Sequence, residues 1–135
     1  MLTGNVLAID PASGASSPPG WALFNKGKLR KYGVITINPK LNVQQRLHQL
    51  QQELATAYFD VDVVVLEEIR GSMAHVYLHW ACGVTASSFP DAALVELPIS
   101  FWKAIVPEGY VKADDTDAAY IGLAAIMIAK ETGNE

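Results

Sequence analysis

The chain has 135 residues, of which half are hydrophobic and only 18% are charged, so it is long and apolar enough for one compact domain over residues 1–135 and is not disordered. Its single cysteine, Cys82, excludes an intramolecular disulfide and a cysteine-rich zinc site. Ten basic and fourteen acidic residues give a net charge of -4. The overall charge therefore does not indicate a nucleic-acid partner, and contacts with phosphate have to be local or mediated by a metal.

The first half of the chain predicts three strands and a helix. Residues 5–10 form a short apolar run that ends in an acid, which is typical of a buried strand. A loop rich in Pro, Gly and Ser leads to a strand at 21–24, and the sequence NKGK at 25–28 turns the chain into a partner strand at 29–37. The spacing of the leucines predicts a helix at 43–59.

The second half alternates strands and helices. It contains a buried strand at 63–66, a helix at 73–86, a strand at 92–97, a short helix capped by Ser100 that ends at 106, and a last helix opened by Asp114. The order β-β-β-α-β-α-β-α-α predicts an α/β fold.

The longest stretch without Asp, Glu, Lys or Arg runs over residues 71–90. Two histidines, three serines and Pro90 favour a buried helix over a membrane span here. We expect the apolar side chains of this helix, Met73, Val76, Tyr77 and Trp80, to cover the sheet. The uncharged opposite face, with His75, His79 and Cys82, then needs a partner, and a second copy of the chain is the simplest one. A zinc site built on the two histidines lacks a third ligand nearby in the sequence.

Acidic residues end two of the predicted apolar strands, where burial disfavours an ionised side chain. A carboxylate at the tip of an apolar strand is costly unless it is paired, hydrogen-bonded or bound to a cation. Asp10 ends the first strand in this way, and Glu67 or Glu68 ends the fourth. Alternation from Val63 and Val65 favours Glu67, with Glu68 as the alternative.

Two further acids, Asp114 and Asp117, share one face of the first turn of the last helix. They suit the cap of that helix as well as a metal, and both roles are compatible. Together with the strand-end acids they form an oxygen-only ligand set that suits Mg²⁺ or Mn²⁺.

The runs VLAIDPAS, PGWALF, VVVLEE and ADDTDAAYIGLAA occur in that order, with a hairpin after the second. This arrangement resembles the RuvC branch of the RNase H-like superfamily, the Holliday junction resolvases, and especially short phage versions. The resemblance implies an RNase H-like mixed five-stranded sheet, three antiparallel and then two parallel strands, flanked by helices. It also implies two Mg²⁺ ions, replaceable by Mn²⁺, held by the catalytic residues Asp10, Glu67, Asp114 and Asp117.

The resemblance implies a homodimer that nicks four-way DNA symmetrically by phosphodiester hydrolysis, in the cytoplasm of a bacterial or phage-infected cell. No targeting segment is visible at Met1 to Asn5, and we expect no membrane partner. The DNA-binding candidates next to the acidic motifs are Arg70, Lys103 and Lys112. A second basic group on the hairpin, which suits a solvated turn equally well, consists of Lys26, Lys28, Arg30 and Lys31.

Two other functions fit parts of the sequence. One is an RNase H-like nuclease of the RuvX type that acts on other branched DNA or on RNA. The other is an actin-like nucleotide-binding domain, in which Ser13 and the glycines of the first loop would hold a phosphate. That function would need a second glycine-rich loop, which residues 60–71 lack. A DNA-binding module without catalysis would be expected to have lost one of the four acids, and all four are present.

Overall fold

The computed structural model describes residues 4–10, 18–57, 60–68, 76–106 and 114–131. Within this part of the chain the elements follow the predicted order. They are β1 (Asn5–Asp10), β2 (Gly20–Asn25), β3 (Lys28–Val34), α1 (Val43–Thr56), β4 (Val63–Glu67), α2 (Val76–Ser87), β5 (Ala93–Leu97), α3 (Ile99–Lys103) and α4 (Asp114–Glu131).

A five-stranded sheet in the order β3-β2-β1-β4-β5 forms the middle of the protein. β2 pairs antiparallel with β1 and with β3, whereas β4 runs parallel to both β1 and β5. The predicted mixed sheet of three antiparallel strands followed by two parallel ones is therefore confirmed.

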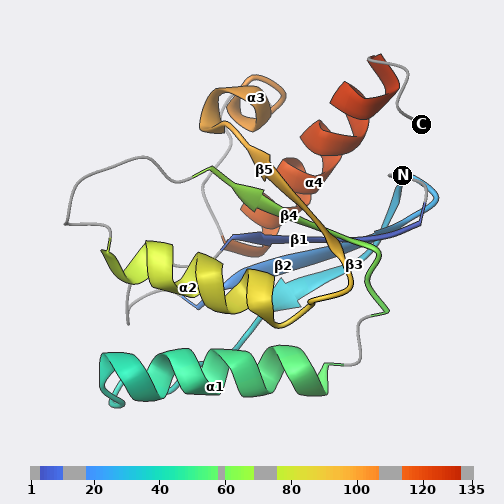
Figure 1. Ribbon diagram of the computed structural model, residues 1–135. Helices are drawn as coiled ribbons and strands as arrows, with labels where there is room; N and C mark the ends of the chain where they lie inside the picture. Colours follow the sequence, from blue (N-terminus) through green and yellow to red (C-terminus); the bar gives the residue numbers. More distant parts are fainter. Residues whose placement is uncertain (1–3, 11–17, 58–59, 69–75, 107–113, 132–135) are drawn as a thin grey trace.

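Helices cover both faces of the sheet: α3 and α4 lie on one face, and α1 and α2 lie on the other (Figure 1). Because β1 and β4 are central and covered on both sides, all four residues from Val6 to Ile9 are buried. Alternate side chains enter two separate cores. The α4-face core includes Val6, Ala8, Phe24, Val63, Val65, Ile121 and Ala125, and the α2-face core includes Leu7, Ile9, Leu50, Leu54, Val64, Leu66 and Ala81.

Polar contacts set the register at the N-terminal ends of the strands. The N–H of Asn5 donates to Oδ2 of Asp62 over 2.8 Å, and the N–H of Asp62 donates to the Asn5 carbonyl over 2.9 Å. Nδ2 of Asn25 donates to Oδ1 of Asn5 over 2.7 Å, which attaches β2 at the same end. We call Asn5, Asn25 and Asp62 the register clamp. A slip of one residue would turn every side chain of a strand to the opposite face.

The β2–β3 hairpin closes at the clamp end of the sheet. Lys26 and Gly27 both have positive φ, 53° and 74°, which is the geometry of the two-residue turn that matches strand twist. Asn25 pairs with Asn5 at the start of β1, whereas Asp10 pairs with Gly20 at its end. The hairpin turn therefore lies at the far end of the sheet from the acid that ends β1.

Several predicted boundaries shift for local reasons. α1 begins as expected, because Asn42 and Gln45 cap each other reciprocally, but it ends at Thr56, and residues 58–59 lie outside the described part. The strand predicted at 29–37 ends at Val34, since its partner β2 begins at Gly20. The prediction that Ser100 caps α3 is wrong: the helix begins at Ile99 after Pro98, and no side chain caps it.

The structure also corrects which side of α2 faces inward. Trp80, expected against the sheet from its helical spacing with the other apolar residues, is 52% exposed, whereas Ala81 and Thr85 are buried. Cys82, expected on the outer side, packs against the α2-face core. Ala81 belongs to the α2-face core, where close packing leaves little room for an indole.

Tyr77 packs against the α2-face core, and its ring lies 4.9 Å from the guanidinium carbon of Arg46 on α1. This contact joins the two helices of that layer. Met73 and His75 lie outside the described residues. None of the helices that the structure describes is long and apolar enough to cross a membrane.

Gly122 allows α4 to lie close to the sheet. A Cβ atom at this position would lie 2.9 Å from Cζ of Phe24 and 3.0 Å from Cβ of Ala8. Both neighbours belong to the α4-face core, so neither has space to move. The absence of a side chain at residue 122 therefore sets the distance between α4 and strands β1 and β2.

We predict that Gly122→Ala lowers the free energy of unfolding by about 1–3 kcal/mol, because the added methyl overpacks the core. Gly83→Ala is the matched control: Gly83 is also helical, but a Cβ there meets nothing within 4 Å. The control should gain up to about 1 kcal/mol from helix propensity. Chemical denaturation of both variants measures the difference, and equal stabilities would contradict the close approach of α4.

Candidate active site

Asp10 and Glu67 lie next to each other at the C-terminal ends of two parallel strands. The register of β1 and β4 pairs Ile9 with Leu66, so the next residues along the two strands are the two acids. Adjacent strands are about 4.8 Å apart. Both residues are only partly buried. The pairing of the strands therefore brings together two carboxylates that are 57 positions apart in the sequence.

Glu67 points to the α4 side of the sheet. Val65 and Val63, two and four residues earlier on β4, belong to the α4-face core, and Oε2 of Glu67 accepts a hydrogen bond of 2.7 Å from Nε1–H of Trp102 on α3. Glu68 has left the strand, and its N–H donates to the Leu97 carbonyl over 2.7 Å. This geometry agrees with the alternation that favoured Glu67 over Glu68.

Asp117 is fully buried in the first turn of α4. It lies one turn before Ile121, which packs in the α4-face core, so its side chain belongs to the face of α4 that meets the sheet. α4 begins near the C-terminal end of β1 and runs back across the sheet (Figure 1). Asp114 is the first residue of α4, and its side chain lies outside the described part of the structure.

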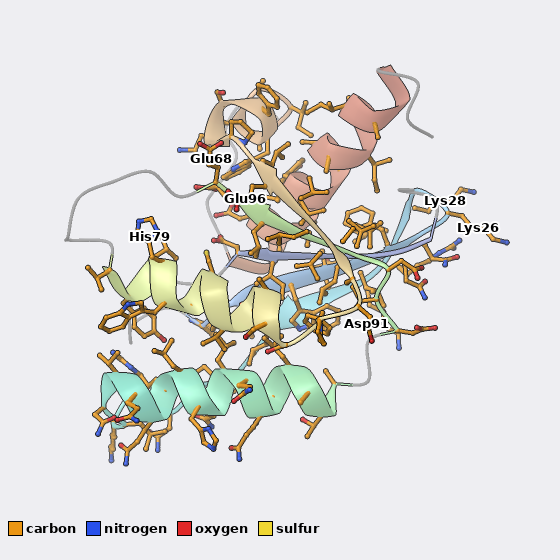
Figure 2. The ribbon with its side chains drawn as sticks, in the orientation of Figure 1. Lys26, Lys28, Glu68, His79, Asp91 and Glu96 are labelled. Atoms are coloured by element: carbon orange, nitrogen blue, oxygen red, sulfur yellow. The ribbon has the colours of Figure 1, made fainter. Side chains whose placement is uncertain are left out.

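A cavity of about 240 Å³ lies on the α2 side of the same sheet end. Glu67 borders it together with residues of α2 and β5, and Figure 2 marks two of them, His79 and Glu96. The full lining is Leu66, Glu67, His79, Cys82, Gly83, Ala86, Leu94 and Glu96.

The Cys82 thiol reports the negative charge of this region. Its pKa is raised from 9.0 to about 12, mainly by burial and in addition by the carboxylates of Glu96, Asp10 and Glu67. Acids on β1, β4 and β5 thus all raise the pKa of the same thiol. A thiol with this pKa stays protonated at neutral pH.

The carboxylates suit a hard divalent cation. Asp10, Glu67 and Asp117 supply only oxygen ligands, which Mg²⁺ and Mn²⁺ prefer. Among the described side chains, no three His, Cys, Asp or Glu residues lie close enough to hold one ion by themselves. Mg²⁺ is ordinarily bound through one or two carboxylates plus substrate phosphates rather than in an all-protein cage, so a pair such as Asp10 and Glu67 fits its requirements.

The basic residues lie at different distances from these acids. Lys103 is exposed on α3, and its Nζ lies 5.8 Å from the centre of the Trp102 ring. Lys26 and Lys28 lie at the opposite end of the sheet from Glu68 (Figure 2), a separation of about 17 Å along β1. Arg30 and Lys31 are exposed on β3. Arg70 and Lys112 lie outside the described residues.

Comparison with solved structures shows the fold. RuvC of Thermus thermophilus, in a complex with a Holliday junction substrate, superposes with a TM-score of 0.75 at 15% identity over 96% of both chains. The fold is that of RuvC. A second structure of the Thermus thermophilus protein gives a TM-score of 0.72 at 16% identity, again over 96% of both chains.

The resolvase of Fowlpox virus, in a complex with Holliday junction DNA, superposes with a TM-score of 0.57 at 16% identity over 91% of this chain and 99% of the viral one. No protein-family model and no curated protein sequence matches the chain. The RNase H-like fold expected from the sequence motifs is thus confirmed by structure, at a level of identity where sequence comparison finds nothing.

Sequence reasoning missed two side chains of this RuvC-type sheet end, Trp102 and Glu96. Trp102 stands 35 positions after Glu67, on a helix too short to show a periodic pattern. Glu96 pairs with Leu66 in the register of β4 and β5, and alternation along the predicted strand at 92–97 would have placed it on the α2 side. No signal in the sequence indicated the hydrogen bond of Trp102.

We predict that Cys82 reacts with iodoacetamide at pH 8 at least 100-fold more slowly than the same thiol in the urea-unfolded chain, because a pKa of about 12 leaves roughly 1,000-fold less thiolate than the ordinary value. The rate should rise with pH up to about 12. Glu96→Gln removes one negative charge and should increase the rate. A folded-state rate equal to that of the unfolded chain would show that the thiol is not held beside these acids.

Proposed function

We propose that this chain is a metal-dependent, structure-selective DNA endonuclease that resolves four-way junctions by phosphodiester hydrolysis. The observation that supports it most is the adjacent position of Asp10 and Glu67 at the ends of parallel strands, in a fold of the RuvC type whose α4 buries Asp117 in its first turn. Two of the similar structures, those from Thermus thermophilus and Fowlpox virus, contain Holliday junction DNA.

In this proposal Asp10, Glu67, Asp114 and Asp117 hold two divalent ions, Mg²⁺ or Mn²⁺. Such ions lower the pKa of bound water and neutralise charge on a leaving oxygen. The contribution of the chain is to position the ligands: β1 and β4 hold two acids on rigid neighbouring strands, and α4 supplies the others. Without bound cations, the concentration of carboxylates at this sheet end repels a DNA phosphate.

A homodimer would supply two such sites. A four-way junction with two-fold symmetry presents two equivalent phosphates, and symmetric cleavage needs two identical sites related by the same axis. We place the interface on the uncharged outer side of α2, from the residues His75, His79 and Cys82. The exposure of Trp80 beside His79 supports an apolar contact on this helix, whereas the inward packing of Cys82 limits its part in that contact.

We predict that Asp10→Asn abolishes cleavage of a synthetic four-way junction but leaves junction binding largely intact. The substitution removes a ligand charge without changing shape, whereas backbone contacts supply most of the affinity for DNA. Cleavage is measured on gels with four-way, three-way and linear duplexes, in Mg²⁺ and in EDTA, and binding by mobility shift.

Asp60→Asn is the control for Asp10→Asn, because Asp60 is exposed and lies outside the strands. Normal nicking by Asp10→Asn in Mg²⁺ would overturn the metal assignment. Cleavage of three-way DNA or RNA in preference to the four-way junction would favour the alternative, an RNase H-like nuclease of the RuvX type.

Lys103 should contribute more to DNA binding than Lys26. Lys103 lies beside Trp102 near the acids, whereas Lys26 lies at the other end of the sheet. We predict that Lys103→Ala weakens junction binding several-fold and lowers the slope of log affinity against log salt by about 1, the value for one lost phosphate contact. Lys26→Ala should change both quantities less. The opposite ranking would place the DNA along the hairpin.

Static light scattering at micromolar concentration should give about twice the chain mass of 14.6 kDa. We predict that His79→Glu, which adds a charge to the outer side of α2, shifts the protein toward monomer. His48→Glu is the control, because His48 is exposed on α1. A monomeric wild type, or a dimer that His79→Glu leaves unchanged, would exclude this helix as the interface.

A further inference from the structure

Trp102 links α3 to the acid at the end of β4. Its side chain is only 4% exposed and packs in the α4-face core, while Nε1–H donates to Oε2 of Glu67 over 2.7 Å. Two backbone features fix where α3 begins. Leu97, the residue before Pro98, pairs with Glu67 in the sheet and accepts a hydrogen bond from Glu68. The indole is therefore held in place independently of the carboxylate that it contacts.

Glu67 needs such a contact more than Asp10 on the adjacent strand does. A glutamate has one more rotatable bond than an aspartate, so at the end of a strand its carboxylate can take up more positions than that of Asp10. A hydrogen bond from a rigid donor to an ionised acceptor is stronger than a neutral one and selects one of these positions. Hydrogen-bond partners of metal-binding carboxylates commonly have this effect.

The packing of Trp102 alone does not account for its orientation. A buried phenylalanine or leucine would fill the α4-face core without a polar atom, whereas a buried indole N–H must find an acceptor. In this structure the acceptor is the Glu67 carboxylate, on the α4 side of the sheet. The same five-residue helix carries Lys103 on its exposed side, with Nζ 5.8 Å from the indole centre.

We propose that Trp102 is a positioning residue for Glu67: its indole N–H holds the Glu67 carboxylate in the orientation that binds the divalent cation. This inference rests on the proposed function. Trp102 touches neither substrate nor metal in this role, and it acts only through the acid. Its loss should therefore weaken the response to Mg²⁺ without changing how the chain binds DNA in the absence of metal.

The first test observes the contact itself. The chain has three tryptophans, so a spectrum of the ¹⁵N-labelled protein should show three indole N–H signals, which single Trp→Phe variants assign. Glu67→Gln replaces the ionised acceptor with a neutral one and should shift the Trp102 signal, leaving those of Trp21 and Trp80 in place. Addition of Mg²⁺ to the wild type should move the Trp102 signal most. A Trp102 signal insensitive to Glu67→Gln would overturn the proposal.

The second test measures the metal dependence of cleavage. Trp102→Phe keeps an aromatic ring but removes the donor, and the half-saturating Mg²⁺ concentration should rise 10- to 100-fold. A benzothienyl-alanine at position 102, in which sulfur replaces the indole N–H, preserves the shape and should give the same change. Trp21→Phe is the control, because Trp21 packs against the α2-face core. Junction affinity in EDTA should stay the same in all variants.

The outcomes separate this inference from the proposed function. If the wild type cleaves junctions in Mg²⁺ but both position-102 variants keep its Mg²⁺ dependence, the positioning role is wrong and the proposed function stands. If the position-102 variants and Trp21→Phe raise the Mg²⁺ requirement equally, the effect comes from packing and the positioning role is again wrong. If the wild type neither cleaves DNA nor shows any indole shift with Mg²⁺, both proposals fail.

Discussion

Parallel pairing of β1 with β4 is the interaction on which the rest of this structure depends. It joins the two central strands, divides their side chains between two cores, and brings Asp10 next to Glu67. A parallel pair needs a crossover connection, and here α1 makes that connection from the antiparallel part of the sheet. The burial of the strands provides the stability, and their ends carry the acids.

Two close contacts then bring helices to this pair from the α4 side. Gly122 lets α4 approach Ala8 and Phe24, which places the buried Asp117 over the same sheet end. Trp102 brings α3 to Glu67 through a hydrogen bond. The first contact requires a residue without a Cβ atom, and the second requires a buried indole N–H. Together they make the arrangement of acids a property of packing rather than of a flexible loop.

The sequence predicted the sheet and the acids at two of its strand ends, because buried strands have a simple signature. Apolar runs that end in an acid identified β1 and β4, and alternation chose Glu67 over Glu68. The inward side of α2 was predicted wrongly, because the spacing of the large apolar residues pointed to Trp80, whereas the small Ala81 and Thr85 are the side chains that are buried. Contacts between residues far apart in the chain, such as that of Trp102 with Glu67, leave no periodic pattern and became visible only in the structure.

The register clamp has a consequence for how such chains can vary. Asn5 and Asp62 hydrogen-bond to each other at one end of the sheet, and on each strand four buried residues separate the clamp from the acid, Val6–Ile9 before Asp10 and Val63–Leu66 before Glu67. The two strands thus have the same number of residues between the clamp and the acid. Exchanges among apolar residues leave this number unchanged, whereas one inserted or deleted residue would turn a carboxylate to the wrong face. Strand length, more than strand composition, is the quantity that this fold has to preserve.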